Sequence, residues 1–303
     1  MDASRKDDLK KAAEAWNRAS SNPRIERARW WQHPQIVRHI NNNVCGQPLP
    51  GASAGLNQLL EDRLQEPLSL GISVGCGTGG KEMVLLRQGL VETFHLYEIS
   101  EVRYNLGKEL AIKNGLENRT KFFLRDAFEP EPLPVYDLVY WNNSLHHMLD
   151  VDDALRWSYD VLKPGGYIVL DDFIGPTRQQ WTERNMRIAS RVRNILPEKY
   201  LRDPRKPERL VPINIERPNV DKLIAADPTE CADSSRILPS LHKHFPDADI
   251  IETGGAIYHL ALNEVLANIS EDDATIMDLL LLIDDLCVEL GETHYATAIA
   301  TKN

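Results

Sequence analysis

The sequence predicts an α/β fold in which helices cover both faces of a mostly parallel sheet. Between residues 68 and 174, short apolar runs typical of buried strands alternate with longer helix-like segments. A glycine-rich turn, GCGTGG at 75–80, connects the first apolar run to the first of these helices. Since 42% of the 303 residues are hydrophobic, the chain also has enough apolar side chains for a large buried core.

The predicted elements of this core follow one another at short intervals. We expect strands at LSLGISV (68–74), TFHLYEIS (93–100), TKFFLRDAF (120–128), YDLVYWNNS (136–144) and YIVLDDFIG (167–175), the last preceded by a turn at KPGG. Helices are expected between them at KEMVLLRQG, EVRYNLGKELAIKNGL and VDDALRWSYDVL. Gly89 and Gly115 are expected to close the first two helices.

Other segments are expected to surround this core. Residues 1–66 are predicted to form an N-terminal helical cover or lid, and residues 67–174 together with 247–303 the core. The Pro- and Arg-rich segment 175–246 interrupts the alternation and is predicted to be an inserted substrate cap. The sheet is expected to resume with a strand at 248–262 and to end with a strand at 294–302.

The helix expected at 271–290 contains acids and no basic residue. Its apolar positions nearly encircle it, so it should be buried on most sides. Packing on the sheet would cover one face, and a homodimer contact would cover another.

Composition limits the partners and the compartment. The net charge of -10 and the pI near 5.4 argue against nucleic acid, because phosphate binding needs a positive surface. The longest apolar run, LLLLI at 279–283, is far too short to span a membrane, and the N-terminus has no apolar signal core. Four scattered cysteines predict neither a disulfide framework nor a zinc site. A cytoplasmic protein without a membrane partner is therefore expected.

The glycine-rich turn fits two classes of nucleotide-like cofactor. Gly75, Gly77 and Gly80 match G-x-G-x-x-G, which suggests a dinucleotide, whereas Gly75, Gly77 and Gly79 match G-x-G-x-G, which suggests S-adenosylmethionine. In both cases glycines let the backbone approach the ligand at a helix N-terminus. Glu98, about 20 residues further on, is placed to accept hydrogen bonds from ribose hydroxyls.

The ordered motifs GCGTGG, YEIS, RDAF, DLVYWNNSLHH and LKPGGYIVL resemble those of the class I S-adenosylmethionine-dependent methyltransferases over residues 68–174. The resemblance implies a Rossmann-like, doubly wound sheet of seven strands with an antiparallel last strand. It also implies S-adenosylmethionine as the cofactor and S-adenosylhomocysteine as its product. Asp126, the LKPGG turn and the terminal strand disfavour a nicotinamide oxidoreductase.

The resemblance assigns cofactor contacts by position. It implies that the glycine loop lies against the amino-acid part, that Glu98 binds the ribose, and that other residues hold adenine or lie near the methionine moiety. Ser73 departs from the family pattern, since many members have an acid there. The implied contacts are Gly75, Cys76, Gly77, Gly79, Glu98, Ile99, Asp126, Ala127 and Asn142.

Three side chains after the fourth and fifth strands are candidates for catalysis. His146 and His147 follow the fourth strand, and an imidazole can accept a proton from an acceptor hydroxyl near neutral pH. Of Asp171 and Asp172, which should point to opposite faces, we expect Asp172 to face the pocket. Packing or capping explains each of these residues equally well. No metal is expected, because Asn142 stands where a magnesium site of the catechol type would have an acid.

Two further segments are candidates for substrate closure. Trp30, Trp31 and His33 are either plain core or part of a lid that excludes water, with Trp31 against the cofactor. In the cap, residues 176–217 contain eleven Lys or Arg against five acids. This excess indicates either a solvated helix face or a surface that recognises an acidic acceptor.

The motifs therefore predict a methyltransferase that acts on a small molecule. The segments WWQHPQIVRHINNNVCG and DPTECADSSRILPSL look like a bacterial subgroup (type 11/12-like) associated with glycan or secondary-metabolite assembly. Methylation at oxygen of a sugar or sugar-containing metabolite is the leading hypothesis. The alternatives are an amine or carboxyl methyltransferase, a nicotinamide oxidoreductase, and an inactive cofactor-binding partner protein.

Overall fold

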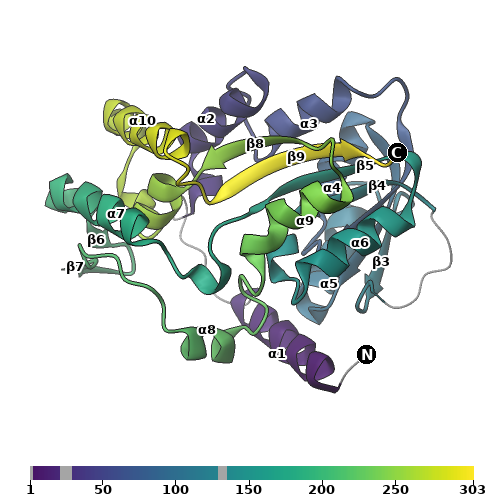
Figure 1. The fold of residues 1–303 in the computed structure, drawn as a ribbon, viewed down its shortest axis with the longest axis horizontal. Coiled ribbons are helices and arrows are strands. Elements are labelled where there is room, and N and C mark those ends of the chain that lie inside the picture. Colours follow the sequence, from purple (N-terminus) through teal and green to yellow (C-terminus); the bar gives the residue numbers. More distant parts are fainter. Residues whose placement is uncertain (1–2, 21–28, 129–134) are drawn as a thin grey trace.

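A computed structural model describes residues 3–20, 29–128 and 135–303 of the chain. Parts of the predicted N-terminal cover, residues 1–2 and 21–28, lie outside the described residues, as does the segment 129–134. Figure 1 shows the fold, with the sheet at its centre and the two ends of the chain on the same side.

A seven-stranded sheet forms the centre of the protein (Figure 1). Its order is β3-β2-β1-β4-β5-β9-β8, and β9 pairs antiparallel with both β5 and β8 while the other pairs are parallel. The predicted Rossmann-like sheet with an antiparallel last strand is thereby confirmed. The strands are β1 (Leu68–Val74), β2 (Val91–Glu98), β3 (Thr120–Leu124), β4 (Tyr136–Asn142), β5 (Leu162–Phe173), β8 (Asp249–Gly254) and β9 (Tyr295–Thr301).

Helices cover both faces of this sheet. One layer comprises α3 (Ala54–Glu61), α4 (Gly80–Gln88) and α5 (Glu101–Lys113), whose apolar side chains, such as Leu60 and Leu86, are buried with those of β1 and β2. The other comprises α6 (Val151–Val161) and α9 (Ile237–His244), which bury Leu155 and Leu241 against the opposite face. Apolar residues at helical spacing thus produce the two-sided cover that the sequence predicts.

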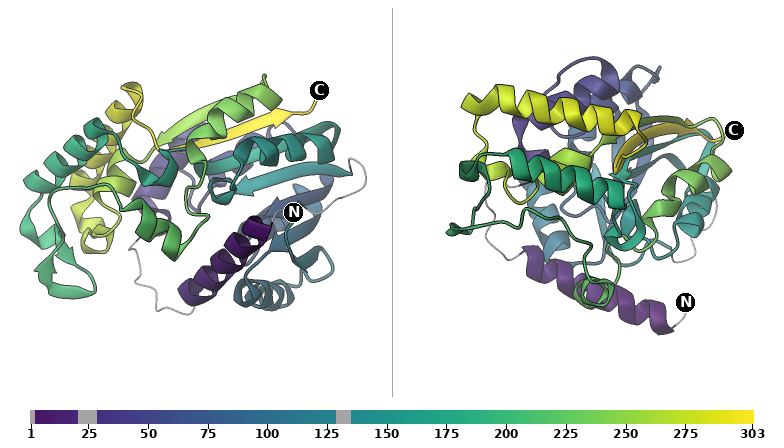
Figure 2. Two further views of the ribbon diagram at one scale, coloured as in Figure 1. Left: turned by 60° about the horizontal axis from the view of Figure 1, so that its bottom comes forward. Right: turned by 60° about the vertical axis from the view of Figure 1, so that its left-hand side comes forward.

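A third apolar cluster forms a lobe beside the sheet. It joins α7 (Glu183–Ile195) to a π-helix (Ala256–Ala261) and α10 (Ala274–Glu289). Leu201 and Val211, which flank the exposed hairpin of β6 (Arg202–Asp203) and β7 (Lys206–Leu210), belong to the same cluster. Figure 2 shows α7 and α10 side by side at one end of the molecule. The lobe therefore comes from two stretches of chain, whereas the sequence analysis expected an insert at 175–246 alone. Conversely, α9 lies within that expected insert but packs in the core.

The expected strand at 248–262 ends early, at Gly254. Gly254 and Gly255 have φ of 91° and 110°, which are conformations that turn the chain out of the sheet. The buried carboxylate of Asp284 on α10 fixes this turn, since Oδ2 accepts from the Gly255 N–H at 2.9 Å and Oδ1 from the Ile257 N–H at 2.6 Å. The KPGG turn also differs from expectation, because Gly165, with φ of 79°, lies within β5 at an irregularity of the ladder.

Two N-terminal helices flank the core. The first, α1 (Ala3–Ser20), lies along α5, where the Asn17 side chain accepts hydrogen bonds from Ser100 Oγ at 2.7 Å and from the Val102 N–H at 3.3 Å. The second, α2 (Pro34–Cys45), packs between α3 and α10. A short helix, α8 (Val220–Ala226), lies to the left of α1 at the lower edge of the view in Figure 1.

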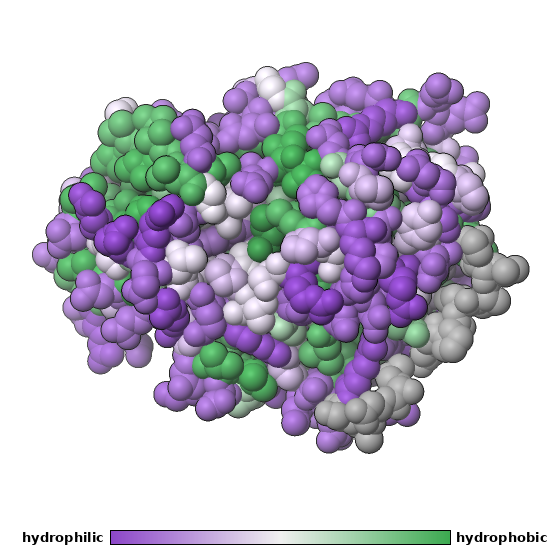
Figure 3. All heavy atoms as spheres, in the orientation of Figure 1, coloured by the Kyte–Doolittle hydropathy of each residue, from purple (hydrophilic) through white to green (hydrophobic). Residues whose placement is uncertain are grey.

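One face of α10 remains exposed, contrary to the expected burial on most sides. Leu279 and Leu290 are 57% and 61% exposed, and Leu282 and Leu286 are similarly open. Figure 3 shows the resulting apolar patch at its upper left. The homodimer stays a prediction. Among the described residues, no helix is both long and apolar enough to cross a membrane.

Candidate cofactor and acceptor site

Three glycines shape the loop between β1 and α4. Gly75, Gly77 and Gly79 have φ of 65°, 60° and 69°, a left-handed conformation that other residues rarely adopt. A Cβ at position 75 would lie 3.2 Å from the Cβ of Ser144, so this glycine lets the loop pack on the loop after β4. A Cβ at position 77 would meet, among the described residues, only the Arg103 guanidinium at 3.9 Å. The backbone at Gly77 therefore has no described side chain packed closely over it.

Glu98, the last residue of β2, holds this loop in place. Its Oε2 accepts from the Gly77 N–H at 2.8 Å, and its Oε1 accepts from the N–H groups of Ile99 and Ser100, each at 2.8 Å. Burial raises the pKa of this carboxyl group above its ordinary value, although the three backbone donors and Arg103 lower it. Each carboxylate oxygen can accept more than one hydrogen bond, so Glu98 retains capacity for a ligand.

A small pocket adjoins the loop and brings together five of the residues predicted to bind the cofactor: Gly75, Glu98, Ile99, Asp126 and Ala127. Its opposite wall is α1, which contributes Arg5, Leu9 and Trp16. The remaining volume is about 100 Å³. Because small-molecule sites usually enclose about 300–1,000 Å³, α1 partly fills the space that a nucleoside would need.

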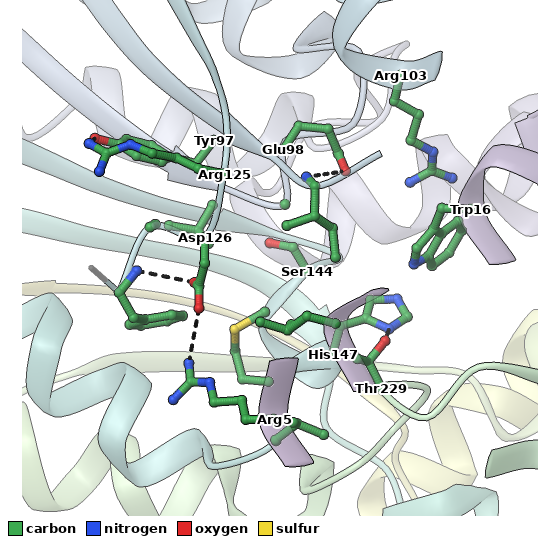
Figure 4. A pocket seen from close by; sticks show the side chains of 18 of the residues that line it. Arg5, Trp16, Tyr97, Glu98, Arg103, Arg125, Asp126, Ser144, His147 and Thr229 are labelled. Carbon is green, nitrogen blue, oxygen red and sulfur yellow. Dashed lines mark hydrogen bonds and ion pairs between the residues drawn. The ribbon is translucent and has the colours of Figure 1, made fainter. Parts of the chain in front are cut away.

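Two side chains of α1 reach across the small pocket (Figure 4). Arg5 forms an ion pair with Asp126, with 3.5 Å between Nη2 and Oδ2. Trp16 lies edge-on to His147, with ring centroids 5.0 Å apart, and its ring faces the Arg103 guanidinium at 3.9 Å. Ser144 also lines this pocket, and its buried Oγ has no partner among the described residues. The sequence analysis missed Arg5 and Trp16, which only the path of α1 brings to the site.

A large cavity of about 780 Å³ lies next to the small pocket. Trp31 is 47% exposed and lines this cavity, not the small pocket, so its contact with the cofactor stays a prediction. Trp30 also lines it but is mostly buried among Tyr258 and Tyr295, with ring centroids 5.4 and 5.0 Å away. His33 is fully buried, and its Nε2 lies 3.3 Å from the Ile269 carbonyl oxygen, as in plain core.

A buried polar network at the floor of the large cavity fixes the predicted residue Asn142. Its Oδ1 accepts a hydrogen bond from Lys81 Nζ, and its Nδ2 donates to Ser53 Oγ at 2.9 Å. Ser53 Oγ in turn donates to Asp171 Oδ2 at 2.5 Å. Burial lowers the pKa of Lys81, which Asp171 partly offsets. Lys81, Ser53 and Asp171 line the cavity, whereas Asn142 supports them from behind.

Cys76, another predicted cofactor contact, lies in the glycine loop but does not line either hollow. Its thiol is half-buried beside the Gly77 carbonyl oxygen at 3.7 Å, and burial raises the thiol pKa well above its ordinary value. Gly77 and Gly79 are likewise part of the loop without lining the small pocket.

The two aspartates at the end of β5 have opposite orientations, but the prediction that Asp172 faces the pocket is wrong. Asp171 lines the large cavity, and Asp172 is fully buried behind it. Asp172 Oδ2 accepts from the N–H groups of Ser144 and Leu145 at 2.8 and 2.7 Å, while Oδ1 contacts His146 Nδ1. Asp172 therefore orients the loop after β4 and reaches the cavity only through His146.

His146 and His147 lie at the inner wall of the large cavity. Burial alone would lower the pKa of His146, but the Asp172 carboxylate outweighs this and raises it. Burial and the neighbouring His146 lower the pKa of His147 to about 4. His147 Nδ1 lies 3.2 Å from Thr229 Oγ1, and Nε2 lies 4.0 Å from Glu230 Oε2.

Thr229 and Glu230 come from the loop after α8, and the sequence analysis missed both. Glu230 belongs to the segment DPTECADSSRILPSL, which was noted for its resemblance and not for its carboxylate. No spacing in the sequence indicates that this loop returns to the histidines, since 82 residues separate His147 from Thr229.

Most basic residues of the predicted cap have partners within the protein. Arg193 is buried and pairs with Glu264, and Arg217 pairs with Glu183, both at 2.8 Å. Of the eleven basic residues at 176–217, all of them described, Arg205 is the one that lines the large cavity. Most of these positive charges therefore form ion pairs or hydrogen bonds within the protein. Recognition of an acidic acceptor stays a prediction.

The fold, the glycine loop and the acid at the end of β2 together define an α/β domain of the nucleotide-binding type with a large cavity beside it. Residues 51–203, half of the chain, match the methyltransferase domain family, and the chain belongs to this family. The predicted family, the class I S-adenosylmethionine-dependent methyltransferases, is thus confirmed, and with it the prediction of S-adenosylmethionine as the cofactor.

Curated relatives share part of their length with this chain. The 27-O-demethylrifamycin SV methyltransferase of Amycolatopsis mediterranei (strain S699) is 34% identical over 121 residues, 38% of this chain and 44% of that protein. Methyltransferase GfsG of Streptomyces halstedii is 30% identical over 149 residues, 48% of this chain and 49% of that protein. The matches thus span less than half the length of these two relatives.

Solved structures show the same fold. A geranyl diphosphate C-methyltransferase from Streptomyces coelicolor A3(2), in complex with Mg²⁺, geranyl diphosphate and S-adenosyl-L-homocysteine, aligns over 82% of this chain and 76% of its own. The TM-score is 0.50 and the sequence identity 14%. At this identity the similarity shows the fold and says nothing of the acceptor.

Proposed function

We propose that this protein transfers a methyl group from S-adenosylmethionine to an oxygen atom of a small molecule. One observation carries the proposal: the small pocket and the large cavity share part of their walls. Trp16, Arg103, Asn143 and His147 line both hollows. A cofactor in the small pocket would therefore present its methyl group to an acceptor in the large cavity, and methyl transfer depends chiefly on such alignment.

The residues of the small pocket fit the nucleoside part of the cofactor. Glu98 offers carboxylate oxygens for ribose hydroxyls, and Asp126 with Ala127 and Ile99 would hold the adenine edge. The unpartnered Ser144 Oγ is a further polar group that a ligand would satisfy. When bound, the cofactor supplies an activated methyl group and a good leaving group. The chain supplies the cradle of glycine backbone and an α1 helix that excludes water.

The large cavity fits an acceptor of mixed polarity. Trp31, Phe173 and Tyr295 give it apolar and aromatic walls, and Lys81 and Asp171 give it polar groups. A volume near 780 Å³ suits a sugar-containing or other secondary metabolite. The name of the rifamycin-related relative, which specifies an O-methyl group, supports oxygen as the acceptor atom. Methylation at nitrogen or at a carboxyl group is the alternative.

Two measurements test this function. Titration calorimetry should show binding of S-adenosylmethionine or S-adenosylhomocysteine and no binding of NAD or NADP. Mass spectrometry of metabolite extracts incubated with the protein and S-adenosylmethionine should then reveal an acceptor whose mass rises by about 14 daltons, the mass of one added CH₂. Tight binding of NAD or NADP would overturn the proposal. So would the finding that every methylated acceptor carries the new methyl group on nitrogen and none carries it on oxygen.

A further inference from the structure

We propose that His146, His147 and Glu230 bind a divalent transition-metal cation in the wall of the large cavity. One ligand atom from each residue lies within 4.8 Å of the other two. All three residues line the cavity, so a cation held by them would keep coordination positions open towards it. This cation site goes beyond the proposed methyl transfer, and the binding of the cation does not depend on it.

The spacing of these groups favours a cation over direct pairing. His147 Nε2 and Glu230 Oε2 are 4.0 Å apart, which is too long for a hydrogen bond. Two atoms that each lie about 2.1 Å from a common ion are about 3.0–3.4 Å apart at octahedral (90°) or tetrahedral angles. The 4.0 Å separation is somewhat longer than this, so a small rotation of the Glu230 side chain would bring both atoms to a common ion, whereas they make no direct hydrogen bond.

Each of the three groups is oriented by a second residue. His146 Nδ1 is engaged by Asp172, which leaves Nε2 for a ligand. His147 Nδ1 contacts Thr229 Oγ1, which itself donates to Asp227 Oδ1 at 2.6 Å.

Glu230 is oriented through its other oxygen. Oε1 accepts from Gln179 Nε2 at 2.9 Å and lies 3.3 Å from Cys231 Sγ, and Oε2 faces His147. Metal-binding imidazoles commonly have such a carboxylate or hydroxyl behind them, which fixes the ring and the tautomer.

The donor set identifies the class of cation. Two imidazole nitrogens and one carboxylate oxygen suit Zn²⁺, Fe²⁺, Co²⁺ or Mn²⁺, whereas Mg²⁺ and Ca²⁺ prefer oxygen ligands alone. The sequence analysis expected no metal because it considered only the acids at the ends of β4 and β5. Glu230 lies 83 residues after His147 in the chain and joins the histidines only in the fold. An oxygen-bearing acceptor in the cavity would complete the coordination shell, and this last step rests on the proposed function.

Cobalt titration tests the site on the whole protein. After treatment with a chelator, the protein should bind one Co²⁺, followed by its visible absorption, and Zn²⁺ should displace it. His147→Ala and Glu230→Gln should each weaken Co²⁺ binding at least tenfold while circular dichroism shows an intact fold. His39→Ala is the matched control, because His39 forms a similar pair with Asp285, 2.9 Å apart, outside the cavity. It should leave Co²⁺ binding unchanged.

Other outcomes separate this proposal from methyl transfer. No stoichiometric Co²⁺ binding, or equal binding by the wild type and the folded Glu230→Gln variant, would overturn the cation site. Calorimetry with S-adenosylmethionine on the same samples tests the methyltransferase function independently. Binding of S-adenosylmethionine without Co²⁺ would reject the cation site alone, and binding of Co²⁺ without S-adenosylmethionine would support the cation site and reject the proposed function.

Discussion

Arg5 of α1 forms an ion pair with Asp126 in the loop after β3, with 3.5 Å between the guanidinium and the carboxylate. The pair ties the N-terminal helix across the small pocket, where Asp126 is the acid proposed to hold adenine. Arg5 therefore pairs with the same carboxylate that the cofactor would use. The pair is partly exposed, so its free energy is modest, about 0.2–1 kcal/mol.

This contact predicts that Arg5→Ala strengthens cofactor binding. The substitution should release Asp126 and loosen α1, and the affinity for S-adenosylhomocysteine in calorimetry should rise up to about fivefold, which is the factor for 1 kcal/mol. Lys6→Ala, an exposed neighbour on the same helix, is the control and should change nothing. Weaker binding by Arg5→Ala would mean that Arg5 contacts the cofactor instead of competing with it.

The core of the fold was predictable because local patterns determine it. Apolar strands alternating with helical patterns predict a mostly parallel sheet covered on both faces, and the spacing from the glycine turn predicts Glu98. The seven-strand plan and the pocket residue Asp126 were implied by the resemblance of the ordered motifs to a known family. The cavity wall was not predictable in the same way. Thr229 and Glu230 meet His147 through a loop that returns from the lobe, and sequence spacing carries no information on such a return.

The orientation of the β5 aspartates shows a second limit. Alternation along a strand says that Asp171 and Asp172 point to opposite faces, but not which face holds the cavity. The choice depends on Ser53 and Lys81, which surround Asp171, and on the N–H groups of the loop after β4, which surround Asp172. The alternation along the strand alone therefore led to the wrong choice between the two aspartates.

Glu98 should affect both the loop and the ligand. Glu98→Ala removes the acceptor of three backbone N–H groups and the proposed partner of the ribose. We expect S-adenosylmethionine to bind about 1–3 kcal/mol more weakly, since hydrogen bonds to a charged group are lost. Calorimetry measures this, and thermal unfolding establishes that the variant folds. Glu101→Ala, on the exposed first turn of α5, is the control; an equal loss in both variants would contradict the assigned role.

Two glycines with the same backbone conformation allow strain and packing to be separated. Gly79 and Gly89 have φ of 69° and 76°, so alanine should cost about 1–2 kcal/mol of backbone strain at either position. At Gly79 the added Cβ would also lie 3.0 Å from Leu96 and 3.1 Å from Phe122, whereas at Gly89 no atom of the described residues lies within 4 Å. Gly79→Ala should therefore lower the free energy of unfolding by about 1–3 kcal/mol more than Gly89→Ala does. Urea denaturation of both variants measures the difference, and equal losses would show that the loop yields without cost.

Asp284 predicts a pH dependence of stability. Burial raises the pKa of its carboxyl group to about 6, although the N–H groups of Gly255 and Ile257 lower it. Because the ordinary value is 3.8, the folded protein binds a proton more tightly than the unfolded chain. The resulting stabilisation is complete below about pH 4 and is lost as the pH rises through about 6, a change of about 3 kcal/mol for a shift near two units.

Asp284→Asn does not titrate, so the free energy of unfolding of the wild type relative to this variant should fall between pH 4 and 6.5, the window that the two pKa values set. Urea denaturation across this range checks the prediction, with the exposed Asp272→Asn as the control. A constant difference between the wild type and Asp284→Asn would show that the carboxyl group keeps its ordinary pKa in the fold.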